Sequence, residues 1–106
     1  MLYRVRARYI DEKLNEFYGK LTDGTIGNQL PDGEEMVASM QRAKITAPGI
    51  IEWFETCYCS SPLKHERETV YDYFLTEIST EVVEDYGVID GESFWVFMQA
   101  MPAVNH

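Results

Sequence analysis

Alternation of apolar and polar residues predicts one strand near the start of the chain and another near its end. Successive side chains of a strand point to opposite faces, so a period of two predicts a strand with one buried face. Residues 2–10 place apolar side chains on one face and arginines on the other: Tyr3, Val5, Ala7 and Tyr9 against Arg4, Arg6 and Arg8. Residues 76–83 alternate in the same way: Ile78, Thr80 and Val82 against Glu77, Ser79 and Glu81.

The stretch 50–59 has a different pattern, because both of its faces are substantially apolar. The two sets of alternate positions are Ile51, Trp53, Glu55, Cys57 and Cys59 against Ile50, Glu52, Phe54, Thr56 and Tyr58. Such a run predicts a central strand that is covered on both sides. Ser60 and Ser61 are good helix caps, and Pro62 suits the first helical position. We therefore expect the strand to end there and a helix to follow over residues 62–74.

A period of three to four residues predicts three helices. Their apolar stripes are Leu14, Phe17, Tyr18 and Leu21 within 12–23, Leu63, Val70 and Phe74 within 62–74, and Phe94, Phe97, Met98 and Met101 near the end. Asp11 can cap the first helix, Asp90 can cap the last, and Pro102 stops the last. Trp95 lies off the last stripe, so this helix is apolar over much of its girth and should seek a second surface.

Residues 34–45 fit a strand better than a helix. As a helix, Met36, Val37 and Met40 form a poor stripe, whereas the alternate positions of a strand separate into two regular sets. Residues 46–49 then read as a four-residue turn that leads directly into the strand at 50–59. The pattern therefore predicts a β-hairpin.

The resulting order is strand, helix, strand, strand, helix, strand, and then a terminal helix. Over residues 2–84 this order resembles the ferredoxin-like β-α-β-β-α-β arrangement and the dimeric α+β barrel proteins that share it. The resemblance implies an α+β fold with a four-stranded antiparallel sheet, its first and third strands in the middle and both helices on one face. It also implies pairing through the open sheet face, with activities ranging from small-molecule oxygenation to isomerisation to pure association.

Length and composition indicate one ordinary globular domain over residues 1–106, with 45% hydrophobic and 25% charged residues. A net charge of −9 repels phosphate backbones and argues against a nucleic-acid partner. We find neither a signal-peptide pattern nor an apolar run near the roughly 20 residues of a membrane span. Two cysteines are too few for a disulfide framework, which favours reduced thiols and a cytoplasmic location.

The three arginines of residues 2–10 are the first candidate site. Under the expected fold they lie on the open sheet face, together with Glu52, Phe54 and Tyr58 from the third strand. Glu77 and Glu81 of the last strand would then lie beside Arg4, Arg6 and Arg8. One interpretation is a solvated face balanced by these carboxylates. The other is an interface, or a pocket for a small anionic, partly aromatic ligand.

The second candidate site is Cys57-x-Cys59 followed by His65. Thiolate and imidazole groups suit zinc or copper, but a structural zinc site usually needs four ligands, and no second Cys/His pair is present. We therefore expect no tightly held metal and no cofactor. A nucleophilic Cys57 or Cys59 with His65 as its base is the remaining alternative.

No phosphate loop, nucleotide-binding glycine pattern, nucleophile elbow or metalloprotease motif occurs. Two hypotheses follow. The favoured one is a small homodimeric binding or association protein, with the open sheet face or the terminal helix in the contact. The alternative is a cofactor-independent enzyme, oxygenase-like or isomerase-like, that holds a small anionic substrate on the arginine face. Arginines that are paired with neighbouring carboxylates would favour the first hypothesis.

Overall fold

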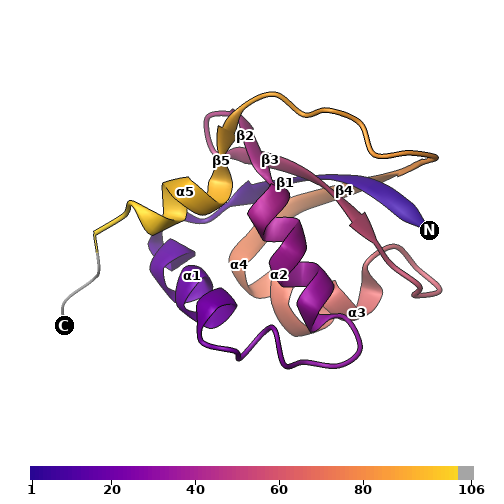
Figure 1. Ribbon diagram of the computed structural model, residues 1–106, viewed down its shortest axis with the longest axis horizontal. Helices are drawn as coiled ribbons and strands as arrows, with labels where there is room; N and C mark the ends of the chain where they lie inside the picture. Colours follow the sequence, from indigo (N-terminus) through magenta and orange to yellow (C-terminus); the bar gives the residue numbers. More distant parts are fainter. Residues whose placement is uncertain (103–106) are drawn as a thin grey trace.

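The computed structural model describes residues 1–102 as helices packed against one open antiparallel sheet (Figure 1). The sheet has five strands in the order β4-β1-β3-β2-β5. Their bounds are β1 Leu2–Tyr9, β2 Lys44–Ala47, β3 Ile50–Thr56, β4 Leu75–Val83 and β5 Glu92–Ser93. Four strands were expected; the fifth is a two-residue segment, β5, that pairs with β2 at the edge. No helix within residues 1–102 has the length and apolar character needed to cross a membrane.

The predicted faces of the central strands are confirmed. Tyr3, Val5 and Ala7 of β1 are buried under the helices, and so are Ile51 and Trp53 of β3. The arginines therefore lie on the opposite face, where the register brings them beside Phe54 and Glu52 of β3 and Glu81 and Ser79 of β4. Strands β1 and β3 occupy interior positions of the sheet, as expected for the first strand and for the strand at 50–59, although β3 ends at Thr56.

The predicted strand over 34–45 is wrong, because the chain is helical from Gly33 to Arg42 (α2). Met36 and Met40 lie one turn apart on this helix and are fully buried, with Ser39 between them. These three buried positions form a narrow stripe along one side of the helix. The residues around the stripe are small or half-buried, and they produced the apparent alternation of a strand. A hairpin still forms, but its first strand is only β2, and Gly49 supplies the positive φ of 78° in the turn.

The remaining helices form close to their predicted positions. The first begins as a 3-10 turn (η1, Asp11–Lys13) and continues as α1 (Leu14–Thr22). The second is a continuous segment of α3 (Lys64–Glu66), a π-helical stretch (η2, Arg67–Tyr71) and α4 (Asp72–Phe74). It starts after Pro62 rather than at it, because Leu63 adopts a left-handed conformation with φ 56°.

The terminal helix, α5 (Phe94–Gln99), packs against α1 and α2 in this chain. Ser93, rather than Asp90, caps it by accepting a hydrogen bond from the Val96 N–H. Phe94 and Met98 are buried, and Phe94 stacks on Tyr9 with ring centroids 5.5 Å apart. Much of the apolar surface predicted for this helix is therefore buried against other elements of the same chain.

Candidate functional site

Two of the three arginines on the open sheet face are paired with carboxylates. Arg4 contacts Glu52 at 3.1 Å, and Arg8 pairs with Glu77, which sits in a left-handed conformation at a bulge of β4. Arg6 is exposed and forms no ion pair within residues 1–102. The face therefore resembles the charge-balanced surface that was one of the two interpretations of the sequence.

Phe54 does not stand open on that face. It is only 8% exposed, because the segment that joins β4 to β5 passes over it. The ring of Tyr86 meets Phe54 edge-on at 5.8 Å, and Gly87 lies against the same ring. Arg4 stacks over Phe54 at 5.9 Å. A ligand would have to displace this cover to reach the aromatic ring.

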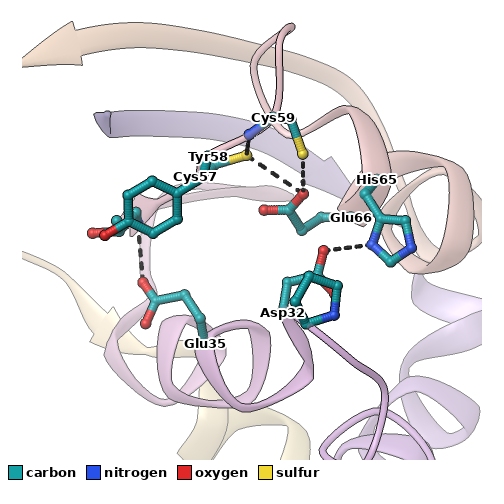
Figure 2. A pocket seen from close by; sticks show the side chains of 9 residues that line it. Asp32, Glu35, Cys57, Tyr58, Cys59, His65 and Glu66 are labelled. Atoms are coloured by element: carbon teal, nitrogen blue, oxygen red, sulfur yellow. Dashed lines mark hydrogen bonds and ion pairs between the residues drawn. The ribbon is translucent and has the colours of Figure 1, made fainter.

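A pocket of about 500 Å³ lies at the far end of β3, where the chain turns toward α3 (Figure 2). It lies between the start of α2 and this turn. Most of its lining is polar or sulfur-containing: Pro31, Asp32, Glu35, Thr56, Cys57, Tyr58, Cys59, His65 and Glu66. A second pocket, of about 370 Å³, lies by Lys20 and Tyr73, and neither pocket is lined by the arginines of β1.

Local backbone structure folds the two cysteines and α3 onto each other. After β3 ends, the N–H of Cys59 donates to the Sγ of Cys57 at 3.3 Å, which curls the chain. The left-handed Leu63 then reverses its direction, and the buried Leu63 side chain anchors the turn in the core. The first turn of the following helix consequently faces back toward the end of the strand and places Glu66 beside both sulfurs.

Cys57, Cys59 and Glu66 form a compact cluster in the pocket wall (Figure 2). The thiols of Cys57 and Cys59 both donate to Oε1 of Glu66, at 3.6 Å and 3.4 Å. One ligand atom from each residue lies within 4.8 Å of the other two. Glu66 is only 1% exposed and forms no ion pair within residues 1–102. Its second carboxyl oxygen points toward the space between Glu35 and Tyr58 in Figure 2.

His65 lines the same pocket but does not belong to this cluster. Its Nδ1 lies 2.6 Å from Oδ2 of Asp32, which precedes α2. Hydrogen bonding to Asp32 raises the pKa of the His65 imidazole and favours its charged form. The sequence therefore identified three residues that share a pocket, but the structure pairs the histidine with a carboxylate rather than with a thiol.

The nucleophile hypothesis finds no support at Cys57. Burial raises the pKa of this thiol to about 12; the backbone hydrogen bond from Cys59 opposes the rise, and the hydrogen bond to the Glu66 carboxylate adds to it. A thiolate, not a thiol, is the reactive form of cysteine. In the metal-free protein Cys57 is therefore a neutral hydrogen-bond donor.

Glu35, which lines the pocket, forms an ion pair with Arg42 on the same helix, α2. Arg42 and Glu35 contact each other at 3.1 Å, and both reach the edge of β3 beyond the end of the short β2. The guanidinium of Arg42 donates to the carbonyl of Phe54 at 2.8 Å, and the N–H of Thr56 donates to Glu35 at 3.0 Å. These two side chains satisfy backbone groups that a longer neighbouring strand would otherwise pair.

Three acidic residues of the site carried no signal in the hydrophobic pattern: Asp32, Glu35 and Glu66. Glu35 and Glu66 lie in helical segments and Asp32 lies just before one, at positions where a carboxylate is most often solvated. Only the reversal at Leu63 turns Glu66 inward, and only the helical state of residues 33–42 brings Glu35 to the strand edge. The spacing of Glu66, seven residues after Cys59, was the one available clue. In a strand–turn–helix unit this spacing allows the first helical turn to fold back on the strand.

Comparison with protein-family models, with curated proteins and with solved structures finds no match. The pocket at the end of β3 is therefore the feature from which a function can be inferred.

Proposed function

We propose that this chain is a small binding protein that holds a cation in the pocket at the end of β3. The observation that supports the proposal is the environment of Glu66, a carboxylate that is 1% exposed and whose only hydrogen-bond donors within residues 1–102 are two thiols. Removing a charge from water without an opposite charge costs several kcal/mol. A cationic ligand in the pocket would supply the missing charge.

The other charges around the pocket favour the same class of ligand. Three carboxylates line it, from Asp32, Glu35 and Glu66. The two nearby basic groups are already engaged, His65 with Asp32 and Arg42 with Glu35. The whole chain carries a net charge of −9, which also attracts cations and repels anions.

This proposal keeps the binding-protein hypothesis and changes the site and the charge of the ligand. A small anion on the arginine face is less well supported, because Arg4 and Arg8 are already paired. The same pairing weakens the cofactor-independent enzyme, whose anionic substrate was expected there. Homodimer formation, a cytoplasmic location and membership of the ferredoxin-like group remain hypotheses, the last compatible with the order of β4, β1, β3 and β2.

The proposal can be tested by thermal unfolding and amide NMR with a panel of Zn²⁺, Mg²⁺, a polyamine, phosphate and citrate. We expect at least one cation, and neither anion, to raise the unfolding midpoint and shift the Thr56 and His65 amides. Glu66→Gln should abolish the effect. Glu68 is exposed on the same helical segment. Glu68→Gln removes the same charge as Glu66→Gln, so this control variant should still be stabilised by the cation. Stabilisation by anions alone, or equal loss in both variants, would refute a cation site at Glu66.

A further inference from the structure

We infer that the cation is a single Zn²⁺ ion bound by Sγ of Cys57, Sγ of Cys59 and a carboxyl oxygen of Glu66. This inference rests on the proposed function and names its ligand. The sequence alone led us to expect no tightly held metal, because two thiols and one imidazole fall short of a ligand set. The structure adds a buried carboxylate between the two thiols, which the sequence pattern did not reveal.

The separations of the three ligand atoms fit a tetrahedral zinc site. Zn–S bonds of about 2.3 Å and Zn–O bonds of about 2.0–2.2 Å at a tetrahedral angle place sulfur and oxygen about 3.5–3.7 Å apart. The observed distances from the two sulfurs to Oε1 of Glu66 are 3.6 Å and 3.4 Å. The ion could therefore bind with little movement of the side chains, in the space between the two sulfurs and Oε1 of Glu66.

Zinc would place its positive charge beside Glu66, while the loss of two thiol protons keeps the net charge of the site unchanged. Coordination would replace two S–H bonds with two Zn–S bonds and release two protons to the solvent. Two thiolates and one carboxylate around Zn²⁺ leave a net charge of −1. This charge would be shared by the ion and its three ligand atoms, in place of a single carboxylate that forms no ion pair within residues 1–102. Sulfur ligands favour zinc over the hard cations Mg²⁺ and Ca²⁺, which prefer oxygen.

A second observation points to a ligand in the same place. The other carboxyl oxygen of the buried Glu66 has no hydrogen-bond partner within residues 1–102 and points into the pocket (Figure 2). This oxygen could complete a bidentate contact or accept a hydrogen bond from a metal-bound water. Three protein ligands leave one tetrahedral position, and the pocket provides space of about 500 Å³ in front of it. The site is therefore open to one further small ligand.

The inference can be tested with this 106-residue chain, kept reduced by a phosphine, by zinc titration calorimetry and native mass spectrometry. We expect one Zn²⁺ per chain. Cys57→Ser, Cys59→Ser and Glu66→Gln should each weaken binding by more than the roughly 10–100-fold that the loss of an outer-shell partner costs. His65→Gln, which changes the pocket wall outside the ligand set, should retain one Zn²⁺. Circular dichroism would verify that each variant is folded.

Co²⁺ provides a readout that a merely structural role of the cysteines would not give. The wild type should show tetrahedral d–d bands and thiolate-to-cobalt charge transfer, and both cysteine variants should lose the charge-transfer intensity. Folded wild-type protein that binds neither Zn²⁺ nor Co²⁺ would refute the zinc site. Zinc binding that depends on His65, or a preference of the site for copper(I) over zinc, would also refute it. Stabilisation by the polyamine without zinc binding would refute the zinc inference and leave the proposed function standing. No binding of any cation would refute both.

Discussion

The indole Nε1 of Trp53 donates a hydrogen bond of 2.8 Å to Oε1 of Glu55, two residues further along the same buried face of β3. The hydroxyl of Tyr71 donates to the same oxygen at 2.6 Å, while Oε2 of Glu55 is buried without a hydrogen-bond partner among residues 1–102. Burial raises the pKa of Glu55 from 4.5 to about 8, against the opposing effect of these two hydrogen bonds. Nearby Glu66 and Glu35 raise the pKa further. At neutral pH the folded protein therefore holds Glu55 mostly as a neutral acid.

We predict that this residue makes the metal-free protein less stable as pH rises. Below about pH 4.5 both the folded and the unfolded states are protonated at Glu55, so the contribution of this group is zero. Between about 4.5 and 8 only the unfolded state ionises, which costs stability, and above 8 the cost is constant. At pH 7 the cost is about 3 kcal/mol.

Glu55→Gln should remove this dependence, because glutamine keeps the acceptor oxygen for Trp53 and Tyr71 and cannot ionise. Urea unfolding in the presence of a chelator should give similar stabilities for wild type and variant near pH 5. Near pH 8 the variant should be more stable. Glu81→Gln, at an exposed position of β4, should show no such divergence. Parallel curves for wild type and Glu55→Gln would mean that Glu55 is ionised in the folded state.

The central strands could be predicted from the sequence because burial on one face leaves a period of two. Val5 and Trp53 alternate with Arg4 and Glu52, and both pairs lie on the faces that the pattern assigned to them. The helix at 33–42 could not be predicted in this way. Its buried stripe is short, and Gly33 and Ser39 are among its buried residues, so the stripe carries little apolar signal.

The candidate site was predictable only in part. Cys57 and Cys59 follow from the strand period, since residues two apart share a face. The contribution of Glu66 depends on a single left-handed residue, Leu63, and a non-glycine residue with a positive φ gives no sequence signal. Tyr58 was expected on the sheet face, but it lies beyond the end of β3, 90% exposed at the pocket rim.

The ion pair of α2 gives a second prediction. Glu35→Ala should remove the acceptor of the Thr56 N–H and one partner of Arg42, leaving both at the strand edge. Hydrogen bonds to charged groups contribute roughly 1.5–3 kcal/mol, and we expect a loss near the lower end because the pair is partly exposed. Hydrogen exchange should show reduced protection at the Thr56 amide. Glu34→Ala, at the exposed neighbouring position, should leave this amide unchanged. Equal protection in the two variants would contradict the bridging role.

Two helical glycines should respond in opposite directions to the same change. A methyl group at Gly19 in α1 meets no atom of the described part of the chain, residues 1–102, within 4 Å, so Gly19→Ala should stabilise the protein by roughly 0.5–1 kcal/mol through helix propensity. At Gly33 the methyl group would overlap with the carbonyl oxygen of Ile26 and lie 3.0 Å from that of Gly27. Both obstacles are backbone atoms, so Gly33→Ala should shift the start of α2 and lower stability. Urea unfolding of the pair measures both effects, and a neutral Gly33→Ala would show that this close approach is not required.

The last prediction concerns self-association. We expect a homodimer in which α5 or the open sheet face is buried, because both keep apolar side chains at the surface. On α5 the side chain of Val96 is 55% exposed, and Trp95 and Phe97 beside it are only partly covered. Since Trp95 packs on Tyr18 and Phe97 on Tyr9, replacing either would also disturb the fold. Val96→Glu is therefore the better probe of the helix.

Val88→Glu tests the other face, because Val88 is exposed on the segment that passes over Phe54. Sedimentation equilibrium at moderate salt should give twice the chain mass of 12.3 kDa for the wild type. Salt screens the repulsion from the net charge of −9 beyond about 8–10 Å, so contact burial can outweigh it. Whichever variant lowers the mass identifies the buried surface. A monomeric wild type at high micromolar concentration would contradict the dimer. The exposed apolar side chains of both surfaces would then remain in contact with water at a concentration at which a specific dimer should form.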